Sequence, residues 1–171
     1  STNWKLKIVG SGPDEKRIKN FARKHNIKNV EFYPAQKPEE FYRKSPIFLM
    51  TSRSEGWGTT LIEAMRFACV PIAFATYTAV YDIIDNRING IILRQSSKSI
   101  EIEDCKKAIV ELINDNKSRN NMALNACEKV KKFSAKIICN HLKSLCFSQK
   151  AHYTFLLFRP YCKLPRKEDQ A

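Results

Sequence analysis

Short apolar segments alternate with amphipathic segments along most of this chain. Leu6 and Ile8 alternate with lysines and are followed by two glycines, a pattern typical of a short strand that ends in a turn. The runs 47–50 and 72–74 are continuously apolar, as expected of parallel strands that are covered on both faces. A further short apolar run lies near 91–93. These segments are predicted to be strands of a parallel sheet.

Amphipathic segments with helical spacing separate the predicted strands. Asp14 is expected to open a helix that carries Ile18, Phe21 and Ala22. Further helices are predicted near 79–84 and at about 101–114, 117–131 and 134–147. Because strands and helices alternate, the fold class is predicted to be α/β, with a Rossmann-like parallel sheet, flanking helices and right-handed crossovers.

Three predicted loops follow strands directly, at residues 10–12, 51–60 and 75–79. In such sheets ligands bind outside the carboxyl ends of the strands. We therefore expect the three loops to converge on one ligand-binding crevice.

The run 52–65 carries the strongest chemical signal, because Glu55 and Glu63 stand eight positions apart around a glycine-broken turn. Gly56 and Gly58 allow the chain to turn sharply and to come close to a ligand. A carboxylate before the turn and another inside the following helix can accept hydrogen bonds from hydroxyls at two separate places. The pattern suits a ligand that carries hydroxyl groups at two separate places.

The helix that follows this turn admits two interpretations. In the first, Thr59 or Thr60 caps the helix, and the free amides of the helix start face a bound phosphate. In the second, Thr60 and Glu63 form a capping box, and Glu55 is an acid favoured by the positive end of the helix. These residues alone leave both interpretations open.

Motifs around this run occur in a specific order along residues 4 to about 145. They are a strand with a Gly-x-Gly-Pro loop at 4–13, a short strand at 30–34, a helix and strand at 41–50, the E-x7-E segment at 55–63, an EAM block with a proline at 63–71 and an Asp-to-Gly block at 85–91. Together they resemble the C-terminal, donor-binding domain of the family 4 (group 1) retaining glycosyltransferases of the GT-B fold. The ordered set is more specific than any single motif.

The resemblance implies a role for each matching residue. Glu55 would be catalytic, facing the donor sugar near its reacting face, and Glu63 would hold the ribose hydroxyls. The amides of Thr59, Thr60 and Leu61 would hold the diphosphate. The other implied donor-binding residues are Gly10, Gly12, Tyr33, Pro34, Gly56 and Gly58, with the base near Tyr33 and Pro34.

The implied activity is transfer of a sugar, with retention, from a nucleotide-sugar to a glycan or lipid-linked acceptor, in polysaccharide or lipopolysaccharide biosynthesis. Neither a metal nor another cofactor is expected, because helix amides and basic groups would meet the charge of the leaving group. Two alternatives stay open. They are a non-catalytic nucleotide-sugar-binding partner of a second subunit and a GT-B-type sugar-nucleotide epimerase.

The length of 171 residues suits one domain with an appendage. We expect a nucleotide-sugar-binding domain at 1–147 that lacks the family's first strand, followed by an apolar and then basic tail at 148–171. The family's acceptor-binding N-terminal domain, and an Arg and a Lys that contact the donor diphosphate, have no match in this sequence. We therefore expect a fragment, half of a split enzyme or a degenerate copy, inactive without an acceptor-binding domain or subunit.

Three residues, at two places in the chain, depart from the family pattern. Ala68 stands where the family usually has glycine, and Thr78 and Ala79 stand where a glycine pair often meets the donor. A methyl group where a backbone approaches the ligand changes the room available to the sugar.

Spacing disfavours several other kinds of site. Glu15 stands where a dinucleotide fingerprint beginning at Gly10 would need glycine or alanine, and the sequence has no P-loop motif. The 6 cysteines show no C-x-x-C pair, and the 3 histidines have no paired acid or nucleophile. Neither a metal site nor a hydrolase site is predicted, and cysteines among apolar residues favour reduced thiols in the cytoplasm.

The formal net charge of +13 comes from 30 basic and 17 acidic residues and calls for an anionic partner or surface. Nucleic acid is not expected, because no recognition motif accompanies the charge. Phosphate-rich donors and the inner membrane leaflet both fit it, so peripheral membrane contact follows from the charge and the resemblance. The apolar run 153–158 is too short to span a bilayer and is either an interfacial anchor or a cover for a bare sheet edge.

Overall fold

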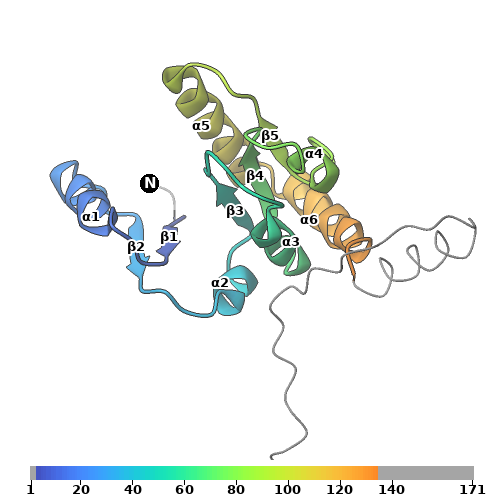
Figure 1. The fold of residues 1–171 in the computed structure, drawn as a ribbon, viewed down its shortest axis with the longest axis horizontal. Helices are drawn as coiled ribbons and strands as arrows, with labels where there is room; N and C mark the ends of the chain where they lie inside the picture. Colours follow the sequence, from blue (N-terminus) through green and yellow to red (C-terminus); the bar gives the residue numbers. More distant parts are fainter. Residues whose placement is uncertain (1–2, 135–171) are drawn as a thin grey trace, which may run out of the picture. The chain divides into compact units, whose positions relative to one another are not determined.

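The computed structural model describes residues 3–134, in which strands and helices alternate along the chain (Figure 1). The elements are β1 (Leu6–Val9), α1 (Glu15–Lys24), β2 (Val30–Tyr33), α2 (Glu39–Arg43), β3 (Ile47–Met50), α3 (Thr59–Arg66), β4 (Val70–Phe74), α4 (Val80–Ile83), β5 (Ile91–Leu93), α5 (Lys98–Asn114) and α6 (Asn116–Lys131). The helix predicted at 134–147, apart from Ser134, and the tail predicted at 148–171 lie outside the described residues.

All strand pairs of the described residues are parallel, which confirms the predicted α/β class. β1 pairs with β2, and β3, β4 and β5 form a second sheet with β4 in the middle. In this second sheet Leu49 lies opposite Ile72, and Ile72 lies opposite Ile91. The sequence predicted one sheet. Within the described residues no hydrogen-bonded ladder joins β1 or β2 to β3, β4 or β5, so these strands form two sheets.

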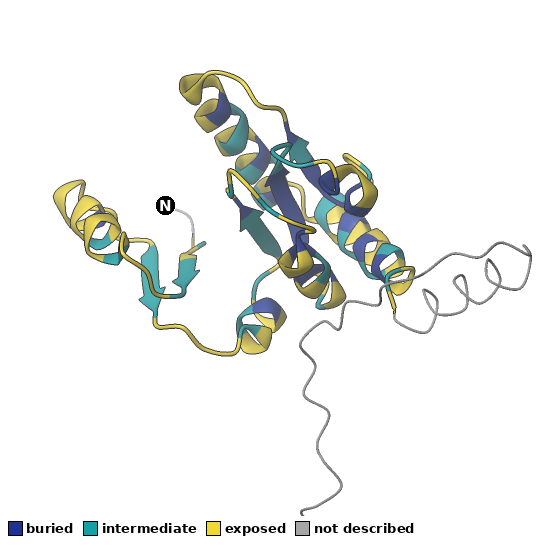
Figure 2. Ribbon diagram, in the orientation of Figure 1, coloured by how far each residue is buried: buried dark blue, intermediate teal, exposed yellow. Residues whose placement is uncertain are grey.

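Buried side chains cover both faces of the three-stranded sheet. Ala73 of β4 packs with Leu61 and Met65 of α3, in a cluster that also includes residues of α4 and α6. The adjacent Ile72 belongs to another cluster, which includes Leu112 of α5. Successive residues of a strand point to opposite faces, so the two clusters lie on opposite sides of β4. Figure 2 shows β4 buried along most of its length, as expected of a central parallel strand.

The β1–β2 sheet is covered much less. β2 is half-buried throughout, and Leu6 of β1 is 50% exposed. Of the apolar residues predicted along α1, Ala22 is buried, whereas Ile18 and Phe21 are exposed. The main core of the described residues therefore surrounds β3, β4 and β5.

Candidate functional site

Gly58 determines where α3 begins. Its backbone is left-handed, with a φ of 79°, and a Cβ built on it would lie 2.5 Å from the Tyr77 hydroxyl oxygen. Its carbonyl accepts a hydrogen bond from the Leu61 amide at 3.0 Å, which closes the first turn of the helix. A Cβ on Gly56, by contrast, would meet no atom within 4 Å. The backbone therefore requires glycine at position 58, where a side chain would be strained and crowded.

The predicted cap at Thr59 or Thr60 is wrong. α3 starts at Thr59 with Gly58 before it, and no side chain of the described residues caps its first turn. Thr60 lies inside that turn, and its hydroxyl lies 4.0 Å from the sulfur of Met50. Because Thr60 does not precede the helix, it cannot form a capping box with Glu63. The amides of Thr59 and Thr60 thus belong to an uncapped helix start, where N–H groups lack intrahelical acceptors.

The two predicted glutamates affect the pKa values of different tyrosines. Glu55 is half-buried in the loop before α3, and its charge adds to burial in raising the pKa of Tyr77. Glu63 is exposed on α3. There, burial and the charge of Glu63 raise the pKa of Tyr42 to about 12. The structure thus places one carboxylate before the helix start and the other within the helix.

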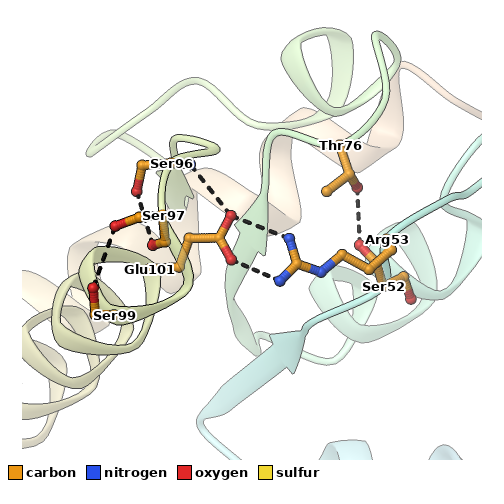
Figure 3. A network of polar contacts seen from close by, with 7 residues as sticks. All are labelled: Ser52, Arg53, Thr76, Ser96, Ser97, Ser99 and Glu101. Atoms are coloured by element: carbon orange, nitrogen blue, oxygen red, sulfur yellow. Dashed lines mark hydrogen bonds and ion pairs between the residues drawn. The ribbon is translucent and has the colours of Figure 1, made fainter.

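Two contacts tie the loop before α3 to neighbouring loops (Figure 3). The Thr76 hydroxyl donates a hydrogen bond to the Ser52 carbonyl at 2.9 Å. The Arg53 guanidinium donates to both carboxylate oxygens of Glu101, with Nη1 3.1 Å from Oε1 and Nη2 2.7 Å from Oε2. The Ser96 amide donates to Oε1 of the same carboxylate at 3.3 Å. Segments that follow β3, β4 and β5 are therefore linked.

Glu101 is a buried charge at the start of α5. Its side chain is 4% exposed, whereas that of Arg53 is 65% exposed. The Arg53 guanidinium, with help from the Ser96 amide, holds the pKa of Glu101 below its usual range. This stabilisation is present above the ordinary pKa of a free glutamate and is lost as the pH falls through the lowered pKa.

The structure joins two of the three loops that were predicted to converge. The loops 51–58 and 75–79 share the hydrogen bond from Thr76 to Ser52. The loop 10–12 follows β1 in the other sheet, where the Gly10 amide donates to the Tyr33 carbonyl at 3.0 Å. Gly10 and Tyr33, both predicted donor-binding residues, are therefore neighbours, and Gly12 and Pro34 are exposed close to them along the chain.

Tyr33 is the last residue of β2, and its hydroxyl already makes a hydrogen bond. That hydroxyl donates to Oε2 of Glu31 at 2.8 Å, and Oε1 of Glu31 pairs with Nζ of Lys5 at 2.6 Å. The hydrogen bond to Glu31 raises the pKa of Tyr33. The Tyr33 ring packs edge-on against Phe41, with ring centroids 4.8 Å apart. A base near Tyr33 would therefore meet an aromatic ring that is already held in place.

Sequence reasoning gave no role to Arg53, Thr76, Tyr77 or Glu101. Arg53 stands in the run around Glu55, but its partner lies 48 residues further along the chain. Glu101 in sequence is an ordinary acid in the first turn of a helix, where the helix dipole favours it. Thr76 and Tyr77 did carry a signal, since they directly follow a buried parallel strand.

The described residues contain no cluster of metal-binding side chains, and Cys69 is not an activated thiol. Within 3–134 no group of three His, Cys, Asp or Glu side chains could hold a metal ion. Cys69 is fully buried, and its thiol donates to the Ser45 carbonyl at 2.9 Å. Burial raises the pKa of Cys69 to about 12, so this thiol stays neutral and structural.

The chain is similar to known proteins over most of its described length. Residues 1–129 match the family model described as glycosyl transferases group 1. An uncharacterised glycosyltransferase of Haemophilus influenzae is 35% identical over 115 residues, which are 66% of this chain and 31% of that protein. The amylovoran biosynthesis glycosyltransferase AmsD of Erwinia amylovora is 34% identical over 113 residues, which are 61% of this chain and 32% of that protein.

Solved structures confirm the fold. The pneumococcal O-GlcNAc transferase GtfA in complex with UDP and GlcNAc matches with a TM-score of 0.72 and 22% identity, over 82% of this chain and 28% of that one. An Anabaena protein in complex with UDP and glucose matches with a TM-score of 0.68 and 18% identity, over 85% of this chain and 41% of that one. The chain thus spans less than half of each solved chain, and about a third of the curated relatives, at 31% and 32% of their lengths.

Proposed function

Because the chain belongs to the group 1 glycosyltransferases, we propose that it binds the nucleotide-sugar donor of a retaining transfer to a glycan or lipid-linked acceptor. The observation that carries this proposal is the start of α3. Gly58 leaves the helix uncapped, Glu55 lies half-buried just before it, and Glu63 is exposed within it. An uncapped helix start flanked by two carboxylates suits a diphosphate with a hydroxyl-bearing group on each side.

The helix start supplies the electrostatic part of the mechanism. The amides of Thr59 and Thr60 are the donors that suit a diphosphate, since the Leu61 amide already bonds to Gly58. Negative charge grows on the diphosphate as the sugar leaves, and preorganised amides stabilise such charge without reorganising. No step in this scheme requires a metal ion.

The glutamates have separate tasks in this proposal. Glu63 accepts hydrogen bonds from the ribose hydroxyls, and Glu55 faces the donor sugar near its reacting carbon. The Tyr77 hydroxyl lies beside Gly58, at the same helix start.

The relatives support the substrate class. The pneumococcal transferase and the Anabaena protein were both solved with UDP, together with GlcNAc and glucose respectively. The Erwinia relative serves amylovoran biosynthesis. We infer a nucleotide-sugar as donor and a cell-surface polysaccharide or lipopolysaccharide as the setting, with the acceptor held by another domain or subunit.

Calorimetry on Glu55→Gln and Glu63→Gln tests the proposal. We expect Glu63→Gln to weaken nucleoside diphosphate and intact nucleotide-sugar alike by about tenfold, which corresponds to ~1.4 kcal/mol. We expect Glu55→Gln to weaken only the intact nucleotide-sugar, because its partner is the sugar. A hydrogen bond to a charged group contributes about 1.5–3 kcal/mol, so either loss is measurable.

The exposed Glu128 on α6 provides a matched control, and Glu128→Gln should change neither affinity. All titrations are run in EDTA and repeated with magnesium. Binding that needs magnesium would contradict the metal-free scheme. Unchanged affinities in both site variants, with only a lower melting temperature, would reduce the two glutamates to a structural role and remove the proposal's main support.

A further inference from the structure

Two consecutive residues before α3 are fixed by groups from other elements. The Ser52 carbonyl accepts the hydrogen bond from Thr76, which follows β4. The Arg53 side chain is held by Glu101 of α5. Glu55 comes two residues later in the same loop, so the loop is anchored close to the carboxylate that the proposed function needs.

The Arg53–Glu101 pair has the geometry of a rigid anchor. A buried carboxylate is costly unless it is paired and hydrogen-bonded, and Glu101 satisfies both conditions with Arg53 and the Ser96 amide. The two parallel bonds from the guanidinium fix its orientation as well as its distance. Figure 3 shows the carboxylate between Arg53 on one side and Ser96 on the other.

We propose that Arg53 and Glu101 are positioning residues, which hold the loop 51–58 so that Glu55 is presented to the donor sugar in one orientation. This inference rests on the proposed function. The loop joins a strand to a helix, and a binding group must be held within a fraction of an ångström to work well. A preorganised loop also loses less entropy when the ligand binds.

Limited trypsin digestion tests the anchor without any ligand. Trypsin can cut after Arg53 only when its side chain leaves Glu101 and the loop enters the protease. We expect Glu101→Gln to speed cleavage of the Arg53–Ser54 bond about tenfold, because a weaker pair raises the population of the locally open state. Mass spectrometry follows this bond and, as a reporter of global unfolding, the bond after Arg119 in α6.

Two further variants make this comparison specific. Glu111→Gln weakens another Arg–Glu pair, with Arg87 at 2.7 Å, and should leave cleavage after Arg53 unchanged. Thr76→Val removes the second anchor without leaving a buried charge, and should speed the same cleavage even if Glu101→Gln folds poorly. Equal cleavage after Arg53 in wild type and Thr76→Val, and in Glu101→Gln where it folds, would overturn the anchor.

Calorimetry then tests the positioning role. We expect Glu101→Gln and Thr76→Val to weaken intact nucleotide-sugar several-fold more than nucleoside diphosphate, because Glu55 is proposed to contact only the sugar. A merely structural role would weaken both ligands equally or neither, and either pattern would overturn the inference.

Failure of the proposed function gives a different result. A wild-type chain that binds neither ligand would overturn the donor site and the positioning role together, whatever the digestion shows. A wild-type chain that binds both ligands, with faster cleavage after Arg53 but an unchanged affinity ratio in the variants, would overturn the positioning role alone.

Discussion

Gly58 and Tyr77 share one small space at the start of α3. The Tyr77 hydroxyl lies where a side chain at position 58 would begin, and it also lies 3.8 Å from the sulfur of Met50. This contact packs the loop after β4 against the loop after β3. At the scale of single residues, the site is therefore shaped by the lack of a side chain at Gly58 and by the large side chain of Tyr77.

Gly58→Ala should destabilise the fold, whereas Gly56→Ala should not. The left-handed backbone at Gly58 costs an alanine about 1–2 kcal/mol, and the 2.5 Å approach to Tyr77 adds to this cost. Urea unfolding measures both variants. A Tyr77→Phe background removes the closest atom and should recover part of the loss. Equal stability of the two alanine variants would contradict this account of the helix start.

At the scale of elements, α3 ends in a tight hydrogen-bonded turn. The Ala68 amide donates to the Met65 carbonyl and the Cys69 amide to the Ala64 carbonyl, which are the two bonds of a Schellman motif. Ala68 itself has a left-handed backbone, with a φ of 62°. Alanine thus occupies the left-handed position in which this motif usually has glycine, and where the resemblance also leads one to expect glycine.

Ala68→Gly should stabilise the protein by about 0.5–1 kcal/mol. The left-handed conformation costs alanine about 1–2 kcal/mol, from which the greater flexibility of glycine in the unfolded chain removes roughly 0.5–1. Ala64→Gly, in the right-handed interior of the same helix, is the matched control and should destabilise by at least about 1 kcal/mol. Urea unfolding gives both values. A loss of stability in both variants would mean that Ala68 is unstrained.

The packing of α3 explains why strain at either end of the helix affects stability. Leu61, Ala64 and Met65 are fully buried, and Met65 packs in the same cluster as Ala126 and Val130 of α6. A helix held this firmly cannot shift to relieve strain at Ala68, or the strain that a side chain at position 58 would introduce. Its start is therefore fixed relative to β3 and β4, which is what a binding site requires.

At the scale of the whole molecule, the net charge and the lengths of the helices indicate which kinds of partner and surface the chain can contact. The net charge of +13 suits a phosphate-bearing ligand or an anionic surface. Within residues 3–134 no helix combines the length and the apolar character that a membrane crossing requires. The apolar run 153–158, the other candidate for surface contact, lies outside the described residues.

The purified chain of 171 residues should bind donor but transfer no sugar at a detectable rate. The resemblance places the acceptor on the other half of a GT-B enzyme, and positioning of both reactants supplies a large part of catalysis. A labelled nucleotide-sugar with an added glycan or lipid-linked acceptor measures transfer, with Glu55→Gln as the control. Robust transfer that is lost in Glu55→Gln would show that this chain provides the acceptor site as well.

Sequence pattern alone predicted most elements closely. The strand at 47–50, the strand near 91–93 and the helix at 117–131 were predicted within one residue of the structure. Such elements depend on the periodicity and the apolar character of a short run of residues, and both can be read directly from the sequence of that run. The run from Glu55 to Glu63 was also visible in sequence, because its glycines and carboxylates lie within one turn and one helix.

Only the tertiary structure decided how these pieces meet. Glu101 holds Arg53 across 48 residues, and no local pattern marks two such partners. The helix start was assigned to a threonine cap, but the helix begins at Thr59 with Gly58 before it. Tyr77, from another loop, leaves no room for a side chain at position 58. The division into two sheets likewise depends on which strands exchange hydrogen bonds. The sequence thus determined the elements and the candidate chemistry, whereas long-range packing decided which side chains hold the site in place.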